Sequence, residues 1–300
     1  MQCTSTVLMI RPAAFGFNDQ TAVNNHFQVL LSTQTQLQEQ ALKEFDRMAE
    51  LLKANDVDVI VIEDSTDVIK PDAIFPNNWF SCTKDMICIF PIFAPNRRTE
   101  KRKDIIDKLK NDLGIKVIHD MSKHEIHSMF LEGTGSMVCD HQHKIIYACL
   151  SERTNKKLVN DYSALINYTT CIFSAVDSKG NDIYHTNVLM CIGENFAVLC
   201  AEAIRNENER YEVTSSLVRT GHQLILISQD QVSNFAGNML QLNSKSGVPL
   251  LLMSKTAKTS LQADQLMELK KYIRPLVADV STIEKTGGGS VRCMVAEIFT

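Results

Sequence analysis

The sequence lacks any apolar run near the roughly 20 residues that a transmembrane helix needs. Its first residues, Met1–Thr4, carry neither the basic segment nor the apolar segment of a signal peptide. The formal net charge of -4 is small for 300 residues, which argues against nucleic acid or an anionic membrane as a partner. We therefore expect a cytoplasmic protein that binds neither.

Cysteine pairs of the C-x-x-C type are also absent, which argues against a zinc ribbon or a thioredoxin-type redox site. The chain has nine cysteines, and most lie in apolar runs, where a reduced cysteine behaves as a small buried hydrophobe. These are Cys88, Cys149, Cys171, Cys191 and Cys200. A functional cysteine must therefore be recognised by its neighbours.

No linker rich in proline, glycine or serine divides the chain, and no block of like charge does so. We therefore predict a single domain over residues 1–300. A composition of 44% hydrophobic and 22% charged residues is that of an ordinary globular protein. Roughly five strand-rich units of about sixty residues can be drawn, but no strong internal repeat forces that division.

Short apolar runs alternate with amphipathic stretches, and this alternation predicts an α/β architecture. Strands are expected at residues 57–62, 145–150, 224–227 and 250–253. Helical spacing of apolar residues predicts helices over residues 37–52, 105–113 and 261–273.

The segment Gly287–Met294 reads GGGSVRCM. Three consecutive glycines imply a backbone conformation or a close approach that a Cβ atom would forbid. A small substrate can reach a cysteine beside such a loop, so Cys293 is a candidate nucleophile. Taken alone, the pattern is explained better by a flexible turn before a buried cysteine.

Two further segments combine turn residues with short polar side chains. Pro71–Trp79 (PDAIFPNNW) holds the only tryptophan and predicts a rigid, ordered loop. Phe130–Ser136 (FLEGTGS) places Glu132 between an apolar strand and a glycine-rich turn. A solvated turn glutamate is an equally good interpretation of the second segment.

Two segments place arginines next to predicted elements. Ser151–Asn155 (SERTN) follows a strand, and Asn96–Glu100 (NRRTE) opens a helix. Arginines in such positions are usually surface charges. They are also the side chains that hold a carboxylate in a bidentate fork.

His185 lies in Asp182–Val188 (DIYHTNV), ahead of an apolar run, where an isolated histidine is more often structural than catalytic. A second group of histidines gathers in a polar stretch, and its spacings do not match H-E-x-x-H or the usual zinc patterns. Its members are His119, His124, His127, His141 and His143. We therefore expect no metal site.

Taken together and in this order, these segments resemble the pentein superfamily, which includes arginine deiminases, amidinotransferases and dimethylarginine dimethylaminohydrolases. The resemblance runs from Arg11-Pro12 to Cys293 and so covers nearly the whole chain. It implies a fold that periodicity alone does not supply. That fold is a five-bladed α/β propeller of ββαβ-type units around a pseudo-fivefold axis, with the site at the centre.

In that family a cysteine, a histidine and a glutamate carry catalysis, and the matching segments here hold Cys293, His185 and Glu132. SERTN is similar to the family's Ser-x-Arg-Thr-Asn element, which implies that Arg153 binds the substrate α-carboxylate. By the same resemblance, Arg98 is the second such arginine.

The chain also departs from the family pattern. Asn77-Asn78 stands where many penteins have a carboxylate, and Asn187 stands where the deiminases often have the aspartate of His-x-Asp. Those carboxylates pair with a cationic guanidinium, whereas asparagine offers a donor and an acceptor that suit a neutral urea. Together with Arg-Pro-x-x-Phe-Gly-Phe-Asn at residues 11–18, this pattern is similar to the citrulline-hydrolase branch.

The resemblance thus implies a cytoplasmic cysteine hydrolase of linear C–N bonds that converts citrulline to ornithine, ammonia and CO2 through an S-carbamoyl intermediate. Asp72, Asn78 and Asn187 would contact the substrate, a small amino acid, with no metal and no cofactor. A homodimer stays open.

The alternatives are an arginine deiminase or an activity like that of dimethylarginine dimethylaminohydrolase and, in another class, a non-catalytic ligand-binding pentein. The sequence does not decide between citrulline, arginine, methylated arginine and agmatine.

Overall fold

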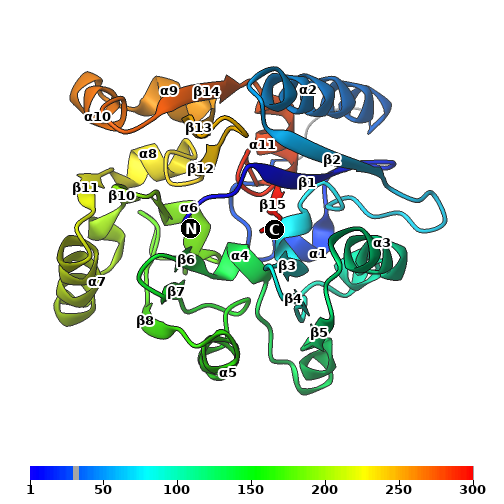
Figure 1. Cartoon of the computed structure of the whole chain (residues 1–300), viewed down its shortest axis with the longest axis horizontal. Helices are drawn as coiled ribbons and strands as arrows, with labels where there is room; N and C mark the ends of the chain where they lie inside the picture. The colour runs from blue at the N-terminus through cyan, green and yellow to red at the C-terminus, as the bar shows by residue number, and fades with distance from the viewer. Residues whose placement is uncertain (30–33, 300) are drawn as a thin grey trace.

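The computed structural model describes residues 1–29 and 34–299, and its architecture is mixed α/β. Within these residues the strands form five three-stranded sheets. In Figure 1 the sheets lie around a common centre, and the longer helices cover the outside. The α/β prediction and the five-unit arrangement implied by the resemblance are both confirmed.

Every sheet has the same internal pattern, an antiparallel pair followed by a parallel pair. From the strand nearest the centre outward, the sheets are β15 (Ala296–Glu297), β1 (Thr6–Arg11) and β2 (Asp58–Glu63); β3 (Phe80–Cys82), β4 (Met86–Ile89) and β5 (Val117–Asp120); β6 (Val138–Asp140), β7 (Ile145–Cys149) and β8 (Thr169–Phe173); β9 (Met190–Ile192), β10 (Phe196–Leu199) and β11 (Gln223–Leu226); and β12 (Leu240–Asn243), β13 (Pro249–Ser254) and β14 (Arg274–Ala278).

A parallel pair of strands needs a crossover connection, and in each unit a helix supplies it. The crossover helices are α2 (Gln34–Ala54), α3 (Lys103–Leu113), α5 (Lys156–Ile166), α7 (Glu207–Arg219) and, in the last unit, α9 (Lys255–Ser260) with α10 (Ala263–Leu269). Shorter helical elements are α1 (Asp19–Ala22), α4 (Gly133–Ser136), α6 (Thr186–Leu189), α8 (Gln229–Ser233), α11 (Ser281–Gly287) and the 3₁₀ turns η1 (Pro76–Asn78), η2 (Pro95–Glu100), η3 (Ser122–His127) and η4 (Ala201–Ala203).

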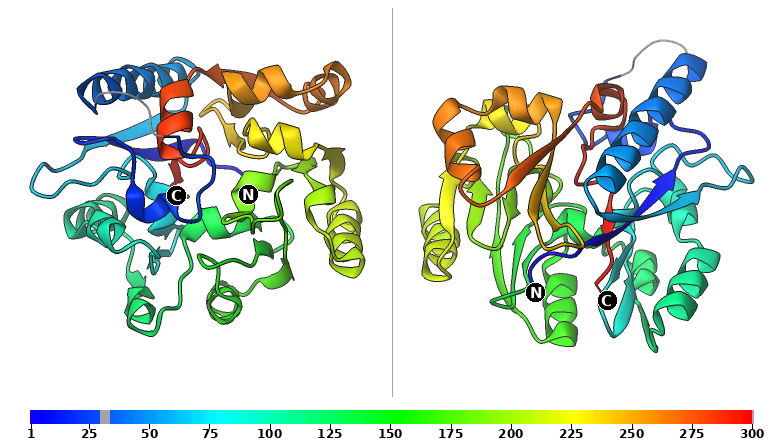
Figure 2. Two further views of the ribbon diagram at one scale, coloured as in Figure 1. Left: turned by 180° about the vertical axis from the view of Figure 1, so that it is seen from behind. Right: turned by 45° about the horizontal axis from the view of Figure 1, so that its top comes forward.

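The first sheet combines segments from the two ends of the chain. β15 pairs antiparallel with β1, and Val7 lies opposite Glu297. The view from behind in Figure 2 places both marked ends close to the middle of the ring. Throughout residues 1–29 and 34–299, no helix is both long enough and apolar enough to cross a membrane.

The predicted strands and two of the predicted helices are confirmed. The four strand predictions correspond to β2, β7, β11 and β13, with ends shifted by one residue at most. The helix predicted over residues 37–52 lies within α2, and Ala41, Phe45 and Leu52 are fully buried beside Val7 of β1. Apolar residues three or four positions apart share one helix face, which explains this burial.

The helix predicted over residues 261–273 is wrong in its extent. Gln262 begins a new helix through a capping box with Gln265, so Leu261 ends the turn after α9 instead of lying inside α10. Ile273 follows the end of α10 and leads into β14. Leu261 and Ile273 lie outside α10 but are buried in the core. Their positions in the sequence coincide with helical spacing, which explains the wrong prediction.

Candidate active site

His185 and Glu132 form a buried hydrogen-bonded pair. His185 Nε2 lies 2.8 Å from a carboxylate oxygen of Glu132, and both side chains are almost completely buried. The other Glu132 oxygen accepts the backbone N–H of Phe93 at 2.9 Å. This pairing fixes the orientation of the ring and leaves Nδ1 as the nitrogen that can exchange a proton with a ligand.

The surroundings set the charge of this pair. Burial raises the pKa of Glu132, but the Arg153 guanidinium and the hydrogen bond from His185 outweigh it and hold that pKa at about 2. Burial lowers the pKa of His185 below its usual value of 6.5, against the raising influence of Glu132. At neutral pH the pair is therefore a carboxylate that orients a neutral imidazole.

Two asparagine side chains hold the Cys293 thiol. Asn238 Nδ2 donates to the sulfur at 3.3 Å, and Asn187 Nδ2 does so at 3.6 Å. Asn238 Oδ1 accepts the backbone N–H of Arg292 at 3.2 Å and also lies 3.7 Å from the sulfur, where it can accept the thiol proton. N–H groups directed at sulfur stabilise negative charge on it, which suits a thiolate nucleophile.

A cavity of about 20 Å³ connects these groups, and we call it the central cavity. Its lining includes Asp72, Asn78, Arg97, Arg153, Tyr184, His185, Gly287–Gly289 and Cys293. Five of the residues proposed from the sequence therefore share one cavity, and Glu132 contacts it through His185. Asn187 contacts the Cys293 thiol but lines a different small cavity, of about 30 Å³.

The fold explains why residues so distant in sequence meet. Asn78 precedes β3, Glu132 precedes β6, His185 precedes β9, Asn238 precedes β12 and Cys293 precedes β15. Each of the five sheets thus contributes the segment that leads into its innermost strand. Because these strands gather at the centre of the ring, their leading segments converge there.

Glycines allow these segments to approach one another. A Cβ atom on Gly133, where φ is +49°, would lie 2.3 Å from the Asn77 carbonyl oxygen, and one on Gly135 would lie 2.6 Å from Asn78 Nδ2. At Gly288, where φ is +64°, it would lie 2.5 Å from the Asn25 side chain. The close approach predicted for the three-glycine loop is therefore confirmed.

Two buried arginines flank the central cavity. Arg97 makes a bidentate pair with Glu100, at 2.9 and 2.8 Å, and donates to Asn78 Oδ1 at 2.9 Å. Arg153 lies over the Tyr184 ring at 4.9 Å and within 3.6 Å of Glu132. Both guanidinium groups are held in place by their neighbours, and the fork of Arg97 is already occupied by the Glu100 carboxylate.

The structure places Arg98 outside the central cavity, contrary to the expectation that it is the second substrate arginine. Its side chain is about one-third exposed, donates to the backbone oxygens of Ile92 and Phe93, and pairs with Glu125 at 3.6 Å. Arg97, one residue earlier, lines the central cavity instead, because η2 directs it inward toward Asp72 and Glu100.

Two cavity-lining side chains keep a buried polar atom with no hydrogen-bond partner among the described residues. These atoms are Asp72 Oδ1 and Asn78 Nδ2. A guanidinium only donates, so Arg97 fixes Asn78 Oδ1 toward itself and leaves Nδ2 at the other end of the amide, beside Gly135. Burial without a partner is costly, so a ligand is expected to supply a donor for Asp72 and an acceptor for Asn78.

Within the described part of the chain, one group of metal-ligating side chains comes together, and it lies away from the central cavity. It consists of Asp140, His143 and His222. No sequence motif connects His222 with the other two residues. Sequence reasoning also missed Asn238, which carries no recognisable motif.

A family model described as N,N dimethylarginine dimethylhydrolase, eukaryotic, matches residues 11–300 of the chain. No curated protein matches this chain.

Solved structures of similar fold include the N-terminal domain of ArgZ bound to substrate, an arginine dihydrolase from the ornithine-ammonia cycle in Cyanobacteria, with 14% identity, a TM-score of 0.73 and 98% of each chain covered. AgrE in complex with L-arginine has 15% identity and a TM-score of 0.73, and the match covers 98% of this chain and 40% of that one.

A dimethylarginine dimethylaminohydrolase variant carrying an adduct with S-methyl-L-thiocitrulline has 15% identity and a TM-score of 0.67, with 98% of this chain and 99% of that chain covered. These likenesses show that the chain has the pentein fold.

Proposed function

Because this chain belongs to the eukaryotic N,N dimethylarginine dimethylhydrolase family, we propose that it is a cysteine-dependent hydrolase of a ureido or guanidino amino acid, with citrulline as its substrate. Its products are ornithine, ammonia and CO2. All nine cysteines are free, which supports a reducing, cytoplasmic location as part of this proposal.

The observation that carries the choice of citrulline is the unpaired Nδ2 of Asn78, a residue that lines the central cavity. A urea oxygen accepts a hydrogen bond from this N–H, and a urea nitrogen donates to Asp72 Oδ1. A guanidinium has donors only, so it would leave the Asn78 N–H buried and unpaired beside a cation. That mismatch costs roughly 1–3 kcal/mol.

Catalysis starts with transfer of the Cys293 proton to His185 Nδ1, which Glu132 keeps oriented through Nε2. The thiolate attacks the ureido carbon, and the N–H groups of Asn187 and Asn238 stabilise its charge beforehand. The imidazolium then protonates the ornithine nitrogen as its bond to carbon breaks, which leaves an S-carbamoyl group on Cys293.

Hydrolysis of this intermediate uses the same histidine. His185, now neutral, takes a proton from water, and the resulting hydroxide attacks the carbamoyl carbon. The C–S bond breaks, the thiol is restored, and the carbamic acid released decomposes to ammonia and CO2. The neutral state of His185 that burial favours is the state that this step needs.

Arg153 is the candidate for holding the substrate carboxylate, whereas Arg97, whose fork is taken by Glu100, positions Asn78. Arg153 also donates to the Thr21 carbonyl and contacts Asn24, and Asn25 donates to the Gly287 and Gly288 carbonyls. The segment around Thr21–Asn25 thus covers a cavity of only about 20 Å³. Ligand cavities are typically about 300–1,000 Å³, so this segment must move to admit citrulline.

The test is a comparison of kcat/KM for citrulline, arginine, dimethylarginine and agmatine, with identification of the products. Wild-type protein is expected to prefer citrulline. Asn78→Asp places an acceptor where the donor was, so the ratio of citrulline to arginine should fall roughly ten- to a hundredfold. Because both substrates are measured on one preparation, the ratio does not depend on the fraction of folded protein.

Asn77→Asp is the matched control, since it adds the same charge one residue away on a side chain that bonds Thr134 and does not line the cavity. It should leave the ratio unchanged. The family model favours a second candidate, dimethylarginine. A wild-type preference for dimethylarginine or arginine would replace citrulline with that substrate, and turnover of none of the four would remove the proposed hydrolase activity.

A further inference from the structure

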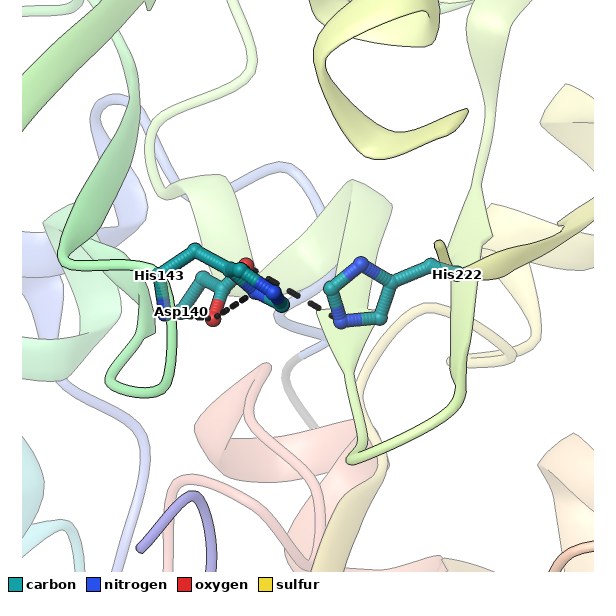
Figure 3. Close-up of side chains that lie close together, drawn as sticks. All are labelled: Asp140, His143 and His222. Carbon is teal, nitrogen blue, oxygen red and sulfur yellow. Dashed lines mark hydrogen bonds and ion pairs between the residues drawn. The ribbon is translucent and has the colours of Figure 1, made fainter. Parts of the chain in front are cut away.

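Asp140, His143 and His222 form a group outside the central cavity, which we call the distal cluster (Figure 3). Asp140 is the last residue of β6, and His143 lies in the turn between β6 and β7. His222 lies between α7 and β11 of the next sheet. Because Glu132 precedes β6 and Asp140 ends it, the distal cluster lies at the end of β6 away from the catalytic pair.

Both histidines direct a ring nitrogen at the same carboxylate. His143 Nδ1 lies 2.9 Å from Asp140 Oδ2, and His222 Nε2 lies 3.9 Å from the same atom. One ligand atom from each of the three residues fits within 4.8 Å of the others. Zinc with bonds of about 2.0–2.1 Å places tetrahedral ligand atoms roughly 3.3 Å apart, between the two measured distances.

The neighbours of His222 fix which of its nitrogens can bind a metal. Its Nδ1 lies 2.8 Å from the Thr220 hydroxyl oxygen. That hydroxyl has the backbone carbonyls of Ser216 and Leu217 as acceptors, at 3.0 and 2.9 Å. With its proton given to a carbonyl, the Thr220 oxygen accepts from Nδ1–H. The lone pair of His222 is then on Nε2, which faces the Asp140 carboxylate.

In this tautomer the Nε2 lone pair faces the Asp140 carboxylate, an arrangement that a cation between them stabilises. Within the described residues no lysine or arginine pairs with Asp140, although its side chain is fully buried. A divalent metal ion satisfies the three groups together, and the hydrogen bond from Nδ1 to Thr220 is the support that metal-bound histidines usually have.

We propose that the distal cluster binds a divalent transition-metal ion, Zn²⁺ or one with similar ligand preferences. Asp140 contributes a carboxylate oxygen, His143 contributes Nδ1 after losing its proton, and His222 contributes Nε2. The His143 side chain is 31% exposed, so solvent can supply the fourth ligand. The ion links the third sheet to the fourth and thereby stabilises the contact between them, where β6 packs beside β9.

Added metal could also bind the Cys293 thiol. The distal cluster differs from that thiol because its ligands are nitrogen and oxygen only. The experiment therefore uses full-length Cys293→Ser protein, which removes thiolate ligation in the central cavity. Zn²⁺ is titrated by calorimetry, and Co²⁺ by visible absorption. We expect one equivalent of each ion to bind, with Co²⁺ bands of low coordination number, no thiolate charge-transfer band, and a rise in Tm of a few degrees at saturation.

Each ligand is then changed in the same background, as Asp140→Asn, His143→Ala and His222→Gln. Removal of any one should weaken Zn²⁺ binding tenfold or more and abolish the rise in Tm. His127→Ala, which changes an exposed histidine outside the cluster, should bind like its parent. His143 is partly exposed, so its variant is expected to fold even if the buried positions do not tolerate change.

Equal Zn²⁺ affinity in the parent and in His143→Ala would overturn the proposal, as would a thiolate charge-transfer band or no bound metal in the parent. Because the proposal does not depend on turnover, its failure is distinguishable from a failure of the proposed hydrolase activity.

Discussion

Two histidine–carboxylate groups occupy opposite ends of the same pair of sheets, and they differ in what surrounds them. In the central cavity His185 lies 2.8 Å from Glu132, and Arg153 lies 3.6 Å from the same carboxylate. In the distal cluster His222 lies 3.9 Å from Asp140, with His143 as the other neighbour. One carboxylate has an arginine beside it, and the other has two histidine rings.

This difference assigns different chemistry to the same pair of residue types. The Arg153 cation compensates Glu132, so His185 can stay neutral and exchange protons with a substrate. Asp140 has no such partner among the described residues, so its two histidines are placed to share a cation with it. The neighbours of a histidine, more than the histidine itself, decide between proton transfer and metal binding.

The largest expected effect is the difference in turnover between variants of two thiols, Cys293 in the central cavity and Cys139 beside the distal cluster. Cys293→Ala should abolish turnover, because no other group in the central cavity can form the covalent intermediate. Cys139, next to Asp140, has a pKa raised to about 12 by burial, so it is protonated and inert. Cys139→Ala should retain turnover per folded molecule. Steady-state kinetics checks both, and equal turnover by wild type and Cys293→Ala would remove Cys293 as nucleophile.

The next effect separates the two buried histidines. His185→Ala should lower kcat roughly 10²–10⁴-fold, since it removes the proton carrier. His222→Ala should lower kcat less than tenfold and act on stability, because it removes a buried ring and its bond to Thr220. Kinetics and thermal unfolding of both variants check this contrast. A hundredfold loss of kcat in His222→Ala would contradict it.

The third effect concerns acid. The folded-state pKa of Glu132 is about 2 and its usual value is 4.5, so its ion pair contributes stability above pH 4.5 that is lost as pH falls toward 2. The contribution is about 3 kcal/mol. Glu132→Gln should therefore flatten the dependence of the unfolding free energy on pH in this range, as denaturant titrations can measure. Glu39→Gln, on an exposed helix position, should leave the slope unchanged, and an unaltered slope in Glu132→Gln would refute the assignment.

The smallest effect separates two adjacent arginines. Arg97→Lys cannot keep the bidentate pair with Glu100 and the bond to Asn78, so KM for citrulline should rise roughly tenfold with a smaller change in kcat. Arg98→Lys changes a partly exposed pair with Glu125, and KM should stay within about twofold. The reverse ranking of the two KM values would return Arg98 to the site.

Part of this molecule could be predicted from the sequence because it depends on local pattern. Short apolar runs located β2 and β7, and helical apolar spacing located α2, because both signals lie among neighbouring residues. The glycines at 133, 135 and 287–289 marked segments that must pack closely. Such segments carry Glu132 and Cys293, so the chemistry was visible in the sequence.

Only the tertiary structure decided which residues meet across the ring. Arg97 and Arg98 are adjacent and chemically equal, and the three-residue period of η2 turns one inward and the other outward. That period also places Arg97 and Glu100 on one face, a signal that could have favoured Arg97. Asn238 and His222 have no local motif. Their roles arise because the fold brings distant segments together, Asn238 at the central cavity and His222 at the distal cluster. No sequence pattern encodes that proximity.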